Sequence, residues 1–176
     1  MSKQAEQGEI VNRVASSGLI SIDLEEYYPK CPIVAYDIAP HLFMGIALKE
    51  MDFRKALGEE DWSQFEGKAV YLHCSVDAII PTWAYMLLMT KLKPYAVKVL
   101  FGGEVDMRNA LMLEAFDAID FSEFQDKMIV IKGCGDLPVG EFAYVEFTNR
   151  LLPFAKSIMY GEPCSTVPVY KKPRKK

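Results

Sequence analysis

The second half of the chain alternates between short apolar segments and longer helix-like segments, and this alternation most limits how the chain can fold. The short segments are rich in β-branched and aromatic residues, which is typical of buried strands. We expect strands over residues 68–75, 95–103 and 127–135. We expect helices over residues 76–92, 104–119 and 141–152. Successive strand–helix pairs predict an α/β fold, a three-layer and mostly parallel sheet with helices on both faces.

The first half is less regular. Residues 9–18 favour a short helix, residues 19–28 a strand, residues 33–50 two short strands around Pro40, and residues 52–65 a helix with a break. We expect these irregular N-terminal strands at an edge of the sheet, in antiparallel pairing. No internal repeat is expected, and the length of 176 residues predicts a single α/β domain over residues 1–170.

Charge is distributed unevenly along the chain. The net charge is −4, and five of the twenty basic residues lie in the last six, "KKPRKK", so the preceding 170 residues carry −9. Residues 171–176 are expected to form a basic, disordered tail. The acidic body repels phosphates and argues against a nucleic-acid partner.

The sequence also bears on compartment and assembly. The N-terminus is polar and no apolar run approaches the roughly 18 residues of a membrane span, so we expect a cytoplasmic protein with no membrane partner. The segment "PTWAYMLL" is apolar nearly all round, which favours either a central place in the core or a homodimer interface.

Two cysteines lie at the carboxyl ends of predicted strands, at the edge where parallel sheets place their ligand sites. Cys74 and Cys134 would each precede a helix N-terminus, whose dipole lowers thiol pKa values and favours nucleophilic or metal-binding chemistry. Asp77 and Asp136 follow closely and could act as ligands, general bases or, by preference, helix N-caps. These four are the candidate catalytic residues, and whether the chain is an enzyme stays open.

A metal site is one reading of the cysteines. Cys74, Cys134 and Cys164 could serve zinc or an iron–sulfur cluster if the fold gathers them. The chain has no C-x-x-C pair, which lowers the expectation of zinc. The alternative is that these cysteines are small core or loop residues.

A second candidate site is anionic. Small residues near the expected helix N-termini could cradle a phosphate, a carboxylate or another small ligand. They are Ser75, Gly102, Gly103, Gly133 and Gly135. Their spacing fits neither the dinucleotide fingerprint nor the P-loop, so nothing specific favours a nucleotide.

Four long strings resemble a bacterial family catalogued as domain of unknown function 2480. The strings are "IVNRVASSGLISIDLEEYYP", "CSVDAIIPTWAYMLL", "KGCGDLPV" and "AKSIMYGEPCSTVPVYK", and the resemblance covers nearly the whole chain. It implies a small cytoplasmic domain with no established activity, encoded near genes of iron–sulfur cluster assembly. It supplies no functional residues.

Two functions follow as hypotheses. The first is a thiol- or metal-binding protein accessory to iron–sulfur cluster metabolism, with iron–sulfur assembly proteins as partners. The second is a dimeric module that binds an anion or small ligand without catalysis.

Overall fold

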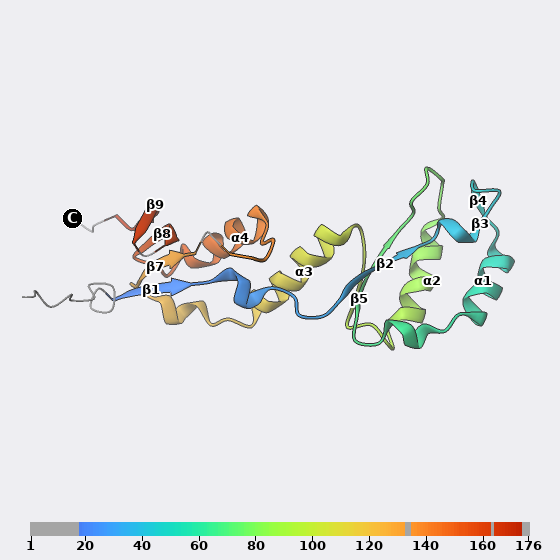
Figure 1. Ribbon diagram of the computed structural model, residues 1–176, viewed down its shortest axis with the longest axis horizontal. Coiled ribbons are helices and arrows are strands. Elements are labelled where there is room, and N and C mark those ends of the chain that lie inside the picture. Colours follow the sequence, from blue (N-terminus) through green and yellow to red (C-terminus); the bar gives the residue numbers. More distant parts are fainter. Residues whose placement is uncertain (1–17, 133–134, 163, 174–176) are drawn as a thin grey trace, which may run out of the picture. The chain divides into compact units, whose positions relative to one another are not determined.

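A computed structural model describes residues 18–132, 135–162 and 164–173. The chain divides into two compact units (Figure 1). Unit 1 combines Met1–Tyr27 with Phe116–Lys176, and unit 2 is the continuous segment Tyr28–Ala115. Helix α3 (Glu104–Asp117) crosses the boundary between them. Unit 1 is therefore discontinuous in sequence. The single domain predicted over residues 1–170 stays a prediction.

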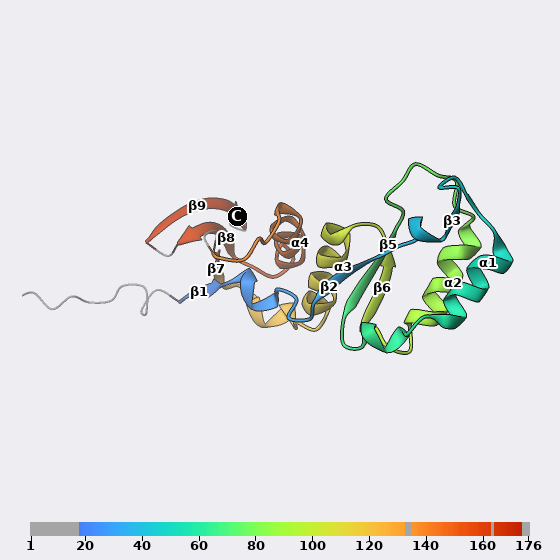
Figure 2. The same cartoon turned by 45° about the vertical axis from the view of Figure 1, so that its right-hand side comes forward.

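Unit 2 contains a parallel sheet in the order β2-β5-β6. Its elements are β2 (Ile33–Asp37), the short pair β3 (Leu42–Phe43) and β4 (Ala47–Leu48), α1 (Glu50–Glu59), the 3-10 helix η3 (Trp62–Phe65), β5 (Ala69–His73), α2 (Thr82–Leu92) and β6 (Lys98–Phe101). Helices α1 and α2 lie side by side on one face of the sheet (Figure 2).

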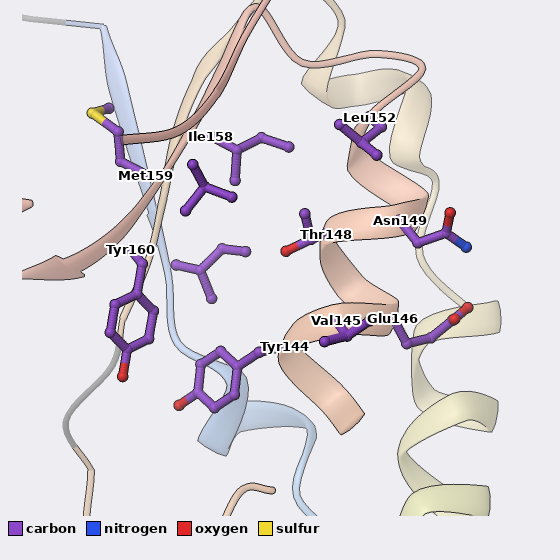
Figure 3. A pocket seen from close by; sticks show the side chains of 11 residues that line it. Tyr144, Val145, Glu146, Thr148, Asn149, Leu152, Ile158, Met159 and Tyr160 are labelled. Atoms are coloured by element: carbon purple, nitrogen blue, oxygen red, sulfur yellow. The ribbon is translucent and has the colours of Figure 1, made fainter. Parts of the chain in front are cut away.

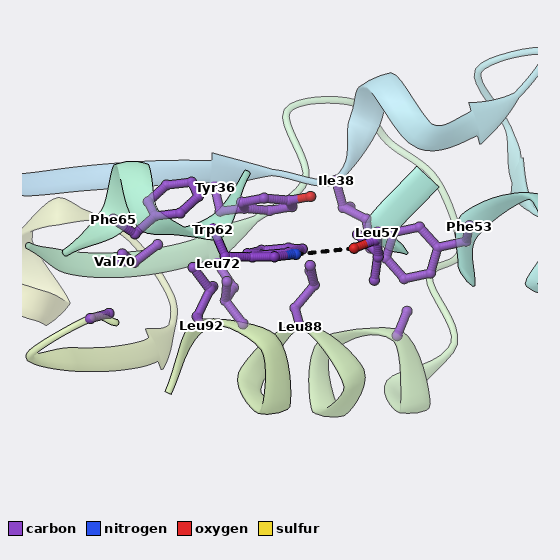
Figure 4. Packing of buried hydrophobic residues seen from close by; sticks show 12 residues of the cluster. Tyr36, Ile38, Phe53, Leu57, Trp62, Phe65, Val70, Leu72, Leu88 and Leu92 are labelled. Carbon is purple, nitrogen blue, oxygen red and sulfur yellow. Dashed lines mark hydrogen bonds between the residues drawn. The ribbon is translucent and has the colours of Figure 1, made fainter. Parts of the chain in front are cut away.

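The core of unit 2 lies between this face and the two helices. Leu88 of α2, Phe53 of α1 and Val70 of β5 belong to one hydrophobic cluster and are almost fully buried (Figure 4). The Trp62 indole stacks on the Tyr36 ring and donates its Nε1–H to the Leu57 carbonyl at 3.0 Å, which satisfies its polar group at the end of α1. The core is thus fixed by apolar burial and by a satisfied buried donor.

Unit 1 contains the sheet order β1-β7-β8-β9, in which only the last pairing is antiparallel. Its elements are β1 (Leu19–Ile22), η1 (Leu24–Tyr27), η4 (Phe121–Phe124), β7 (Met128–Ile131), α4 (Glu141–Leu151), β8 (Ser157–Glu162) and β9 (Ser165–Lys171). Phe147 of α4 is fully buried and contacts the rings of Phe116 and Phe121.

The two units repeat the same pattern. Helix α2 and the turn after it contain four buried residues. Each has a buried counterpart 59 positions later in the chain, in α4 or the turn after α4. These pairs are Ala84 and Ala143, Leu88 and Phe147, Leu92 and Leu151, and Ala96 and Ala155. The spacing holds without a gap from Asp61–Gly103 to Asp120–Glu162.

Turn chemistry is repeated as well. Asp61 accepts hydrogen bonds from the N–H and Oγ–H of Ser63 at 3.0 and 2.6 Å, and Asp120 accepts the same two bonds from Ser122 at the same distances. The expectation of no internal repeat is therefore wrong. The repeat escapes notice because burial and turn chemistry are kept while most residues differ, and because β1 is separated from the rest of its own unit.

The α/β class with parallel sheets predicted from the sequence is confirmed. The predicted strands divide between two sheets, because β5 pairs with β2 and β6 in one sheet, whereas β7 pairs with β1 and β8 in the other. Strands β1 and β2 do lie at sheet edges but pair parallel, where antiparallel pairing was expected, whereas the short strands β3 and β4 pair antiparallel with each other in a separate sheet. Strand β1 thereby becomes the neighbour of β7 in unit 1, and β2 becomes the neighbour of β5 in unit 2.

Three further expectations concern the chain ends and membrane spans. Residues 9–17 of the predicted N-terminal helix lie outside the described residues. Strand β9 extends into the predicted tail through Lys171, and Lys172 Nζ pairs with Asp126 at 2.9 Å, whereas residues 174–176 lie outside the description. In the described part of the chain, no helix is long and apolar enough to cross a membrane.

The core of unit 2 gives the first testable prediction. Leu88→Ala should lower the free energy of unfolding by about 2–5 kcal/mol, because it removes a fully buried side chain and leaves a cavity. Thr90→Ala, on the exposed side of the same helix, should change it by no more than about 0.5 kcal/mol. Urea denaturation of both variants measures the difference, and equal values would contradict the packing described.

Candidate functional site

The carboxyl edge of the unit 2 sheet is closed by the chain itself. The Asp37 carboxylate, at the end of β2, accepts hydrogen bonds from the N–H and Oγ–H of Ser75 at 3.0 and 2.5 Å and from the Ala39 N–H at 2.9 Å. Burial alone would raise the pKa of Asp37, but these hydrogen bonds and the nearby His73 lower it below its ordinary value. The predicted ligand-binding Ser75 is therefore engaged by an internal carboxylate.

The glycines after β6 are engaged in a similar way. Gly103 donates its N–H to the Asp106 carboxylate at 2.7 Å, and Gly102 donates its N–H to the Leu72 carbonyl at 3.1 Å. A side chain at Gly102, whose φ is +146°, would overlap with Asp106. Both N–H groups proposed for an anion thus serve the chain, and Gly102 is needed for its backbone conformation.

The two predicted N-caps do not cap helices. Helix α2 begins at Thr82 with Pro81 at its N-cap, and α4 begins at Glu141 with Gly140 at its N-cap. Asp77 and Asp136 lie in the loops that precede them. The cap interpretation is wrong because each loop continues for several residues before its helix starts. Their other predicted roles stay predictions.

The cysteines are distributed over both units. Cys74 is half-buried against the unit 2 core, Cys31 is half-buried, Cys164 is exposed between β8 and β9, and all three are free thiols. Cys134 and Gly133 lie outside the described residues. Among the residues described, no group of three or more His, Cys, Asp or Glu side chains could hold a metal ion. The described set therefore does not fit a zinc ion or an iron–sulfur cluster, and a site that includes Cys134 stays a prediction.

Unit 1 has an apolar cavity of about 600 Å³ between α4 and the sheet (Figure 3). Val145, Thr148 and Leu152 approach it from α4, and Ile158 lies on its sheet side. The remaining lining residues are Ile131, Tyr144, Glu146, Asn149, Met159, Tyr160 and Val169. A concave, mainly apolar space of this size is typical of sites for small organic ligands.

A polar cavity of about 440 Å³ adjoins it at the carboxyl edge of the sheet. Three residues, Tyr144, Val145 and Tyr160, line both cavities, which makes them two parts of one cleft. The polar part is also lined by Asp23, Glu25, Lys132, Gly135, Leu137, Val139 and Glu141. We call the two cavities together the unit 1 cleft. Of the five small residues predicted to bind a ligand, Gly135 lines it.

Acidic groups dominate the polar part. Lys132 Nζ lies 3.2 Å from Asp23 Oδ2, and this hydrogen bond and charge raise the pKa of Lys132, with Glu162 and Glu26 adding to the effect. Glu25 accepts a hydrogen bond from the Leu137 N–H and so ties η1 to the loop after β7. Among the described residues that line the cleft, Lys132 is the single cation, and it lies among the carboxylates of Asp23, Glu25 and Glu141.

An aromatic pair lines the unit 1 cleft, and a corresponding pair lines a groove in unit 2. In unit 1 the rings of Tyr144 and Tyr160 meet edge-on with centroids 5.7 Å apart, and in unit 2 Tyr85 and Phe101 do so at 4.9 Å. Unit 2 has a groove of about 400 Å³ whose lining residues all have counterparts in the unit 1 cleft, 59 positions later. They are Leu72, Tyr85, Met86, Met89, Val99, Leu100 and Phe101.

Sequence reasoning missed the polar residues of the cleft. Asp23 and Lys132 each follow a strand, at positions that correspond to Asp37 and His73 in unit 2. The recurrence of an aspartate, a basic residue and a tyrosine at the carboxyl edge of both sheets was the available signal. It could be found only after the repeat had been recognised.

The chain belongs to the family described as "Protein of unknown function (DUF2480)", whose model matches residues 8–172 of its 176. The family resemblance inferred from the four strings is thereby confirmed. No curated protein and no solved structure matches the chain.

The closed edge of unit 2 gives a pH-dependent prediction. Ser75→Ala should raise the pKa of Asp37, because the carboxylate loses a hydrogen bond that stabilises its charged form. A folded pKa below the unfolded value contributes stability above pH ~4 that is lost as the pH falls. The variant should therefore be less stable at pH 7 and lose less stability on acidification.

Carboxyl-carbon NMR titration and urea denaturation at pH 7 and pH 3 measure the two effects. Ser63→Ala is the matched control, because its hydroxyl serves Asp61 and should leave the Asp37 titration unchanged. An unchanged Asp37 pKa in Ser75→Ala would contradict the assignment.

Proposed function

We propose that this member of the DUF2480 family is a small-ligand-binding protein and that the unit 1 cleft is its binding site. The supporting observation is the junction of an apolar and a polar cavity at the carboxyl edge of parallel strands. Ligands of open α/β sheets bind at this edge, and an apolar pocket with a few convergent polar groups is the usual form of such sites.

The charges of the cleft favour a ligand with a cationic group. The polar part is lined by Asp23, Glu25 and Glu141 against the single cation Lys132, whose partner is Asp23. An anion placed there would meet two further carboxylates, whereas an amine could be paired by them. The apolar part would hold a hydrocarbon or aromatic body. We therefore propose an amphipathic amine as the ligand class, in preference to the anion.

The other predicted functions stay proposals. A thiol or metal role accessory to iron–sulfur metabolism depends on Cys134, which lies outside the described residues, and so do the proposed iron–sulfur partners. Cytoplasmic location is likewise a proposal. We also propose the homodimer, which is favoured by the exposure of Met86 and Met89 on α2.

A matched pair of indole compounds tests the ligand class. Tryptamine should bind the full chain at least about tenfold more tightly than indole-3-propionate, a difference of about 1.4 kcal/mol, because the two share an apolar body and differ in charge. Isothermal titration calorimetry measures both. No binding of tryptamine, or tighter binding of the carboxylate, would overturn the proposal.

Filling the apolar cavity tests the location. Thr148→Trp should weaken tryptamine binding at least about tenfold, since the indole would occupy the space between α4 and the sheet. Met89→Trp, at the corresponding position of the unit 2 groove, is the matched control and should leave the affinity within about twofold. If Met89→Trp weakened binding and Thr148→Trp did not, the site would lie in unit 2.

A further inference from the structure

The outer edge of β6 is open in unit 2. Strand β6 ends its sheet, and within the described ranges no strand pairs with its outer edge, whereas its counterpart β8 is covered by the antiparallel β9. The Gly102 N–H points to β5, where it meets the Leu72 carbonyl. Because backbone groups alternate along a strand, Val99 and Phe101 direct their N–H and C=O groups outward. These groups form a short unpaired template.

Apolar side chains surround this edge. Phe101, Met86 and Val97 have exposed fractions of 68%, 65% and 54%. Phe101 and Met86 line the unit 2 groove beside the edge. An open strand with apolar neighbours is typical of a protein–protein interface.

Strand β9, at the end of the other sheet, differs in this respect. It carries Pro168, which has no N–H, and its pairing with β8 shifts register between Ile158 and Met159. Proline and bulges are the devices by which edge strands avoid pairing with other chains. Strand β6 has neither device in its four residues, Lys98–Phe101.

We propose that β6 pairs antiparallel with β6 of a second copy of this chain. This inference rests on the homodimer proposed above and names its surface. A two-fold axis at Leu100 sets Val99 opposite Phe101 of the second copy, and Phe101 opposite Val99, so that the outward backbone groups of all four residues pair. The apolar side chains then meet on the groove face.

The same register explains why the partner is a second copy. The Leu100 side chains of the two copies meet on the face of the strand opposite to the one that carries Val99 and Phe101. Lys98 of one copy lies beside Gly102 of the other, so no two like charges are paired. The strand is therefore complementary to itself in both shape and charge. The geometry also extends the sheet in the way that β9 extends the sheet of unit 1, by an antiparallel strand on the equivalent edge.

Sedimentation equilibrium of the full chain tests the surface. The wild type should be a dimer, and Phe101→Lys should weaken dimerisation at least about tenfold, because it places a charge opposite Val99 in the apolar pairing. Val167→Lys is the matched control, because it alters a valine of β9 whose exposed fraction, 62%, is similar to the 68% of Phe101, and it should leave the dimer intact.

A monomeric wild type would overturn both this inference and the homodimer. A dimer that resists Phe101→Lys but not Val167→Lys would overturn the β6 surface and leave the homodimer standing. Neither result bears on ligand binding, which tryptamine reports from unit 1.

Disulfide trapping tests the register in a chain whose four native cysteines are replaced by serine. Leu100→Cys should form an interchain disulfide under oxidation, because residues in a non-hydrogen-bonded antiparallel pair have Cα atoms about 4.5 Å apart. Lys98→Cys, on the same face, should not, since the register separates the two copies of residue 98 by four residues, about 13 Å. Crosslinking at 98 but not at 100 would overturn the register.

Discussion

Each unit depends on the packing of one helix against its central strand. In unit 2 the stripe Ala84, Leu88 and Leu92 is fully buried and belongs to the same cluster as Val70 and Leu72 of β5. A groove remains between α2 and the edge strand β6, lined by Met86, Met89, Val99 and Phe101 among others. The grooves of both units follow from this one packing arrangement.

The two units then differ at the carboxyl edge. In unit 2, Ser75 binds Asp37, and the loop after β5 closes on the end of β2. In unit 1 the corresponding aspartate, Asp23, pairs with Lys132, and a cavity of about 440 Å³ remains beside them. A repeated framework has thus produced one closed edge and one open edge, and ligand binding is proposed for the open one.

The local pattern of the chain was predictable, and its long-range pairing was not. Hydrophobic periodicity located the strands and helices of the second half, because a buried face requires apolar residues at the period of the helix or strand. Periodicity carries no information on partners, so the pairing of β1 with β7 across a whole unit was missed. The cleft was missed for the same reason, since Asp23 and Lys132 meet only through that pairing.

The insertion of unit 2 between β1 and the rest of unit 1 has a consequence for the order of folding. Unit 2 is continuous, so its sheet can form as soon as residues up to Ala115 have left the ribosome. Unit 1 must wait, because Leu19 pairs with Met128 and this contact closes a loop that contains all of unit 2. An early-folded unit 2 shortens that loop in effect and lowers the entropy lost on closing it. The nested arrangement therefore favours folding of unit 2, which has the closed edge, before unit 1, which has the open one.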